Sequence, residues 1–158
     1  MRKLLIVVAL VFAHTAWSGD FEDGVAAAKR GDHATAFVKF RGAAQQGNTD
    51  AQYALGWMFV KGQGVAQDYR EAVRWYRLAA QQGQTDAQHN LGLMYWNGQG
   101  IAQDYVRAHM WFNIAAINGD KDSVKNRDLA ASKMTPQQIE QAQRMARECM
   151  ASNFNKCD

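Results

Sequence analysis

A tandem repeat constrains this chain more than any other feature of its sequence. Residues 47–82 are followed directly by residues 83–118, and 19 of the 36 aligned positions are identical. Self-similarity at a fixed period of this length is the signature of repeat folds, in which each unit packs against its neighbours. The chain is therefore predicted to form an array of similar units and not one irregular core.

Each unit is predicted to contain two helices joined by a glycine-bearing turn. The segments 49–52 and 85–88 both read Thr-Asp-Ala-Gln, a capping box in which Thr is the N-cap and Gln closes the box. The first helix then ends at a Gly-Gln-Gly turn, residues 62–64 or 98–100, where glycine permits a positive φ. The expected N-caps of the second helices are Asp68 and Asp104.

Small residues recur at matched places in the two copies, and we expect them to let paired helices approach closely. Glycine inside a helix costs roughly 1 kcal/mol relative to alanine, so Gly92 needs a packing reason. The matched pairs are Ala51 and Ala87, Gly56 and Gly92, and Ala72 and Ala108.

Degenerate copies flank the two clear repeats, as the ends of a solenoid require. Upstream, a partial repeat lacks the long turn. Downstream, Thr135-Pro-Gln-Gln138 is predicted to cap a last helix that runs to about Met150 and buries Ile139, Ala142, Met145, Ala146 and Cys149. The expected organisation is one repeat domain at 19–158, divided into a degenerate repeat at 21–47, repeats at 48–83 and 84–119, and a capping hairpin at 120–158.

The first 18 residues are typical of a secretory signal peptide. Arg2 and Lys3 precede an apolar run, and Ala16-Trp17-Ser18 is a small-x-small cleavage site. The apolar run is too short for a membrane span, although an uncleaved anchor is the alternative interpretation. A periplasmic or secreted location is the prediction.

Charge and motifs exclude several classes of function. Two of the 18 basic residues lie in the leader, so the remaining 16 basic and 15 acidic residues give a net charge of +1, which supports neither a nucleic-acid nor an anionic-membrane partner. No zinc-protease, nucleophile-elbow, P-loop, S-x-x-K or K-T-G motif occurs, so an enzyme, including a β-lactam-interacting one, is not expected. We expect no cofactor and no metal site.

The two cysteines, Cys149 and Cys157, both lie near the C-terminus. In an oxidising compartment such a pair most simply forms one disulfide. A metal site would need further ligands, and the nearest histidine is His109.

The pattern D-A-Q-x-x-L-G-x-M-[FY]-x-x-G-Q-G-[VI]-A-Q-D-Y, continued by A-x-x-W-[YF]-x-x-A-A-x-x-G, resembles the Sel-one-like repeat family, a relative of the tetratricopeptide repeat. The resemblance covers residues 49–119 and, more weakly, 21–47, and the tail at 126–148 is similar to the helical cap of exported members. It implies an all-α fold, a right-handed αα-hairpin solenoid of about four repeats and eight helices. In the secreted cysteine-rich branch, disulfides join cysteines with seven residues between them, as Cys149 and Cys157 have, but the earlier repeats here carry no such pair.

The resemblance also implies an interaction scaffold, with the first helix of each hairpin lining a concave groove. An aromatic and amphipathic row along that groove would suit a peptide or protein partner, because Trp and Tyr dominate interface hot spots. Packing of Trp57 and Trp96 against neighbouring helices is the alternative. The predicted partner-binding residues are Tyr53, Trp57, Val60 and Lys61 in one copy and His89, Leu93, Trp96 and Asn97 in the next.

Together these features predict a monomeric exported adaptor that binds a protein or peptide in its groove. The alternative is a cell-envelope structural factor that contacts peptidoglycan or its synthetic machinery.

Overall fold

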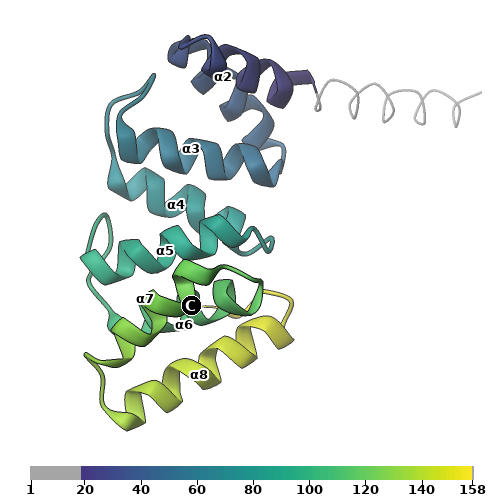
Figure 1. The fold of residues 1–158 in the computed structure, drawn as a ribbon. Coiled ribbons are helices and arrows are strands. Elements are labelled where there is room, and N and C mark those ends of the chain that lie inside the picture. The colour runs from purple at the N-terminus through teal and green to yellow at the C-terminus, as the bar shows by residue number, and fades with distance from the viewer. Residues whose placement is uncertain (1–18, 158) are drawn as a thin grey trace, which may run out of the picture. The chain divides into compact units, whose positions relative to one another are not determined.

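The computed structural model describes residues 19–157, and every regular element among them is a helix (Figure 1). The predicted signal peptide, residues 1–18, lies outside the described residues. The chain divides into two compact units, one ending at Gln67 and the other beginning at Asp68. The expected all-α fold of helical hairpins is confirmed.

The first unit contains a helix over residues 19–29, then α2 (His33–Gln45) and α3 (Thr49–Lys61). The helix over 19–29 lies close to α2 because it carries Gly24, where an added Cβ would lie only 2.7 Å from the Phe40 ring. The core of this unit is built from small residues around a few large ones, namely Ala27, Ala36, Phe40, Ala43, Ala44, Ala51, Leu55 and Met58.

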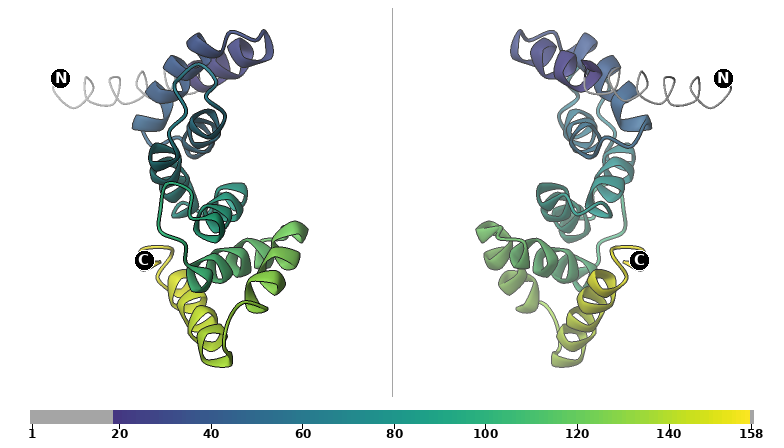
Figure 2. Two further views of the ribbon diagram at one scale, coloured as in Figure 1. Left: turned by 90° about the vertical axis from the view of Figure 1, so that its left-hand side faces the viewer. Right: turned by 90° about the vertical axis from the view of Figure 1, so that its right-hand side faces the viewer.

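The second unit contains α4 (Tyr69–Ala80), α5 (Thr85–Asn97), α6 (Tyr105–Ile117), α7 (Lys121–Ala131) and α8 (Pro136–Ala151). Helix α6 contacts α5, α7 and α8 (Figure 2). It is the most deeply buried of the five helices. Gly92 permits the close contact of α5 with α6, because a Cβ there would lie 2.7 Å from the Phe112 ring. The packing reason predicted for Gly92 is therefore present.

The helix caps agree with the sequence except at the first helix of each repeat. Asp68 and Asp104 cap α4 and α6, and Thr135 and Gln138 form a complete capping box on α8. The expected Thr N-caps of α3 and α5 are wrong, because Asn48 and Gln84, one residue earlier, are the N-caps and each accepts a backbone N–H with its side-chain oxygen.

The glutamines expected to close those boxes have another role. Gln52 and Gln88 are buried, and each donates its Nε2 hydrogen to a carbonyl oxygen near the end of the preceding helix, Ala44 or Ala80, at 3.2 Å. Each carbonyl also accepts a backbone N–H at 3.0 Å, from Gly47 or Gly83, so the glutamine adds a second hydrogen bond to it. The side chain therefore joins two helices.

The long turn after each first helix packs on the helix that lies one hairpin earlier. Gly64 has φ +71°, and a Cβ there would collide with the backbone of His33 at the start of α2. Gly100 has the same φ, and its Cβ would collide with the carbonyl of Tyr69 at the start of α4. Only glycine adopts the left-handed conformation readily and also leaves room for the close approach, because it has no Cβ.

The C-terminal helices follow the predicted hairpin with a smaller buried face. Ala142, Ala146 and Cys149 of α8 are buried as expected, whereas Ile139 and Met145 are only half-buried because they lie at the edge of the face that α8 turns to α6. Cys149 and Cys157 form a disulfide that holds the segment after α8 against the end of that helix.

Candidate functional site

The predicted binding residues of α3 lie on one side of the helix with graded exposure. Tyr53 and Val60 are half-buried, Lys61 is exposed, and Trp57 is 39% exposed although it is the largest apolar side chain of the row. A large aromatic residue that a folded chain leaves this accessible is the type of residue that dominates binding hot spots.

Tyr53 and Trp57 line an apolar pocket of about 360 Å³ within the first unit. We call this the first-unit pocket. The pocket exists because small residues stand between large rings: Ala28 and Ala54 leave the space that Phe40, Tyr53 and Trp57 surround. Its complete lining is Ala28, His33, Phe40, Tyr53, Ala54, Trp57, Met58 and Gln63.

Two polar side chains, His33 and Gln63, stand at this apolar surface. His33 is the first residue of α2, and Gln63 is the central residue of the glycine turn after α3. Gln63 Oε1 is buried and has no hydrogen-bond partner within the described part of the chain. A buried acceptor without a partner costs about 1–3 kcal/mol.

The predicted binding residues of α5 have a different environment. Trp96 packs on Tyr105 with ring centroids 4.9 Å apart. Trp96 and Leu93 also border a small cavity of about 30 Å³ beside α6 and α7. Asn97 is exposed and donates to the Gln99 side chain at 3.5 Å. Internal packing thus accounts for much of the Trp96 surface, and Trp57 is the more accessible of the two tryptophans.

His89, at the position of Tyr53, bonds to the start of α7. Its Nδ1 lies 2.7 Å from both Asp120 Oδ2 and Ser123 Oγ. Burial raises the pKa of the Asp120 carboxyl, but hydrogen bonds from Ser123 and His89 outweigh burial and hold that pKa below its ordinary value. Equivalent positions therefore differ: Tyr53 lines a pocket in the first unit, whereas His89 in the second unit is hydrogen-bonded to Asp120 and Ser123.

This cluster has the residue types of a serine hydrolase but not the geometry. In a catalytic triad the carboxylate and the hydroxyl meet opposite nitrogens of the imidazole. Here Asp120 and Ser123 meet the same nitrogen, and Ser123 is 0% exposed. The arrangement supports α7 and presents no nucleophile to a substrate.

Several features of the described residues bear on other kinds of site. No three His, Cys, Asp or Glu side chains between residues 19 and 157 gather where they could hold a metal ion. None of the helices over the same residues has the length and apolar character needed to span a bilayer.

Sequence reasoning found the aromatic wall of the first-unit pocket and missed the rest of it. No sequence pattern marks Phe40, His33 or Ala28 as residues of a pocket. Gln63 was assigned to a turn, although a glutamine between two glycines at a helix end was the one available signal for a polar group near the row.

Comparison with known proteins agrees with this fold. The model of the Sel1 repeat family matches residues 49–84 and 85–120. No curated protein matches the sequence.

Solved structures of similar proteins cover most of the chain. One is c5321, a protective antigen present in uropathogenic Escherichia coli strains that displays an SLR fold, with a TM-score of 0.81 and 31% identity over 87% of this chain. A Sel1 repeat protein from Oxalobacter formigenes matches 66% of the chain with a TM-score of 0.62 and 33% identity. The chain spans 31% and 41% of the lengths of these two proteins.

Helicobacter pylori cysteine rich protein B has the same fold at lower identity. The TM-score is 0.56 with 18% identity, over 70% of this chain and 93% of that one. Three findings agree with one another: the two repeats matched by the family model, the helical hairpins described above and these structural neighbours. The chain carries two Sel1 repeats and folds as a Sel1-like repeat protein.

Proposed function

We propose that this chain is an exported adaptor that binds a peptide or a peptide-like segment of a protein. The first-unit pocket anchors an apolar side chain of that partner. The observation that carries the proposal is the accessible ring of Trp57 at the wall of an apolar pocket of about 360 Å³. Such a volume accommodates one large side chain, and apolar pockets with few polar groups are the usual form of ligand sites.

The polar groups at the pocket favour a peptide over a purely apolar ligand. His33 and the Gln63 side chain line the pocket and would offer polar contacts to the backbone next to the anchored side chain. The anchor would bury apolar area against Phe40, Tyr53 and Trp57. Sel1 repeats commonly serve as protein-interaction scaffolds, which is consistent with a peptide partner.

Export is part of the same proposal. It rests on the leader-like sequence of residues 1–18 and on the Cys149–Cys157 disulfide, because such bonds persist in oxidising compartments. Expression of the full chain in a bacterial host followed by fractionation and N-terminal sequencing tests this point. Recovery of a periplasmic chain that begins at Gly19 is expected, and an intact chain in the cytoplasm would refute export.

The binding test uses peptides selected on the purified wild-type chain from a random display library. Trp57→Ala should weaken binding of the selected peptides by about 2 kcal/mol, the loss typical of a hot-spot truncation. Leu78→Ala is the matched control, because Leu78 is also 39% exposed but lies on α4 in the other unit. Circular dichroism and urea denaturation must show that both variants fold.

The outcomes separate the site from the scaffold. Loss of binding in Trp57→Ala alone supports the pocket. Equal binding by both variants would leave the repeats as a scaffold and refute the first-unit pocket as the site. If Trp57→Ala lost folding stability and kept its peptide affinity, the indole would be a packing residue.

A further inference from the structure

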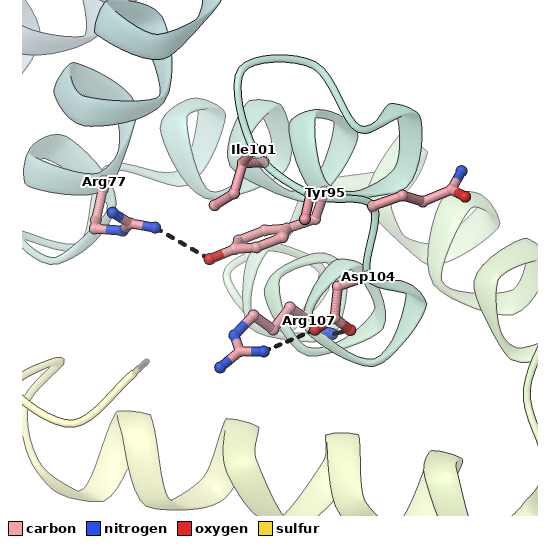
Figure 3. A pocket seen from close by; sticks show the side chains of 7 residues that line it. Arg77, Tyr95, Ile101, Asp104 and Arg107 are labelled. Atoms are coloured by element: carbon pink, nitrogen blue, oxygen red, sulfur yellow. Dashed lines mark hydrogen bonds and ion pairs between the residues drawn. The ribbon is translucent and has the colours of Figure 1, made fainter.

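The first-unit pocket differs in charge from a pocket of about 430 Å³ that lies within the second unit. Figure 3 shows the second of these, which is lined by charged side chains that bond within the protein. Arg77 donates to the Tyr95 hydroxyl at 3.1 Å, and Arg107 donates to Asp104 at 2.7 Å. None of the described residues that line the first-unit pocket is Lys, Arg, Asp or Glu. An uncharged side chain therefore enters the first-unit pocket at a lower desolvation cost than a charged one.

The apolar wall of the first-unit pocket is mainly aromatic. Phe40, Tyr53 and Trp57 line it together with the thioether of Met58, and no Leu, Ile or Val is among its described lining residues. Rings attract a further ring in offset or edge-to-face contact beyond the effect of the buried area, and methionine sulfur also contacts ring edges favourably. An aliphatic side chain of the same size would bury apolar area without these contacts.

The next repeat, 36 residues later, does not have this wall. Leu93 stands at the position of Trp57, and Asn90 stands at the position of Ala54. Leu93 borders a cavity of only about 30 Å³, whereas Trp57 borders a pocket of about 360 Å³. The indole wall and the space beside it are therefore features of the first unit and do not follow from the repeat fold alone.

We propose that the side chain anchored in the first-unit pocket is aromatic, and belongs to a phenylalanine, tyrosine or tryptophan of a peptide. The inference rests on the proposed function and deepens it by naming the anchor. The ring of the anchor packs against Phe40, Tyr53 and Trp57, because aromatic hot spots tend to pair with one another across an interface. The polar side chains of the pocket, His33 and Gln63, meet the peptide backbone beside the anchor.

The test is an NMR titration of the full folded chain with four N-acetyl amino-acid amides, followed at the indole N–H signal of Trp57. The probes carry the side chains of phenylalanine, cyclohexylalanine, leucine and arginine. Cyclohexylalanine has the outline of phenylalanine and at least as much apolar surface, but it has no π-system. The phenylalanine probe should bind between about twofold and tenfold more tightly than the cyclohexylalanine probe, which is the range for a ring contact beyond area burial.

Two variants connect this preference to the pocket wall, with binding followed at the backbone N–H signal of Ala54, which also lines the pocket. Trp57→Leu introduces the residue of the next repeat and removes one ring, so the preference for phenylalanine over cyclohexylalanine should shrink. Phe59→Leu is the matched control, because it removes a ring from the same helix that packs against Phe37 and does not line the pocket. This variant should keep the preference.

The outcomes separate the identity of the anchor from the existence of the site. If the cyclohexylalanine probe bound as tightly as the phenylalanine probe, the aromatic anchor would be overturned and the apolar pocket of the proposed function would stand. Equal binding of the arginine probe would overturn the uncharged anchor. If no probe shifted either signal, the pocket would not be a site, and the proposed function would fail with it. The ranking of the probes on the wild-type chain decides the question if the variants fail to fold.

Discussion

The glycine at position 100 offers the sharpest test of how the repeats fit together. A side chain at this position has two separate costs: the left-handed backbone, with φ +71°, and a collision with the Tyr69 carbonyl. The Cβ position is fixed by the backbone of residue 100 and the atoms it meets are backbone atoms, so no side-chain rotation relieves the collision. Gly100→Ala should therefore move the whole turn away from the start of α4.

A matched variant separates the two costs. Gly119 also has a positive φ, +99°, but nothing lies within 4 Å of a Cβ added there. Gly119→Ala should lower the free energy of unfolding by about 1 kcal/mol, the cost of a left-handed conformation for an L-residue. Gly100→Ala should lower it by about 3 kcal/mol, because overpacking adds roughly 1–3 kcal/mol.

Urea denaturation followed by circular dichroism measures both values. Gly64→Ala provides a replicate in the first unit, because its Cβ would collide with the His33 backbone in the same way. It should resemble Gly100→Ala and not Gly119→Ala. If all three variants lost the same stability, the close approach of turn and helix would contribute nothing, and the reasoning would be refuted.

Three further predictions concern the second unit. Replacing Cys149 and Cys157 by Ser should cost about 2.5 kcal/mol, the loop entropy for cysteines eight positions apart, and make the C-terminus more sensitive to protease; unchanged proteolysis would contradict this. The interactions that hold the pKa of the Asp120 carboxyl below its ordinary value of 3.8 stabilise the fold above that pH. This stabilisation is lost as the pH falls through the folded pKa, so Asp120→Asn should flatten the acid limb of the curve of stability against pH. Burial, aided by Arg127, lowers the pKa of His109 below 6.5, so wild-type stability should be greatest above pH 6.5 and fall below it, whereas a His109→Leu variant measured by urea denaturation at pH 5 and 7 should lose that fall.

The repeat period was enough to predict the helices, because a 36-residue repeat with glycine turns and Asp caps leaves few ways to bury its apolar stripes. The caps of α3 and α5 were misplaced by one residue. Asn48 and Thr49 are both good N-cap residues, and in the fold Gln52 donates to the Ala44 carbonyl of another helix at 3.2 Å. A contact between helices is not visible in a local motif.

The binding row was only partly predictable for a similar reason. Spacing along one helix placed Tyr53 and Trp57 on the same side, and this is the aromatic wall of the first-unit pocket. The space in that pocket depends on the small side chain of Ala28. The hydrogen bonding of His89 depends on Asp120, 31 positions further on. Both partners lie in the degenerate flanking copies, where the sequence period no longer indicates which residues meet.

The collision geometry at Gly64 and Gly100 also limits how such a chain can change its length during evolution. Each glycine turn packs on the start of a helix from the previous hairpin. The packing of a hairpin therefore includes residues that come later in the sequence. An insertion or deletion that is not a whole 36-residue unit would place a turn without its glycine over a helix start. Duplication in whole units preserves every such contact.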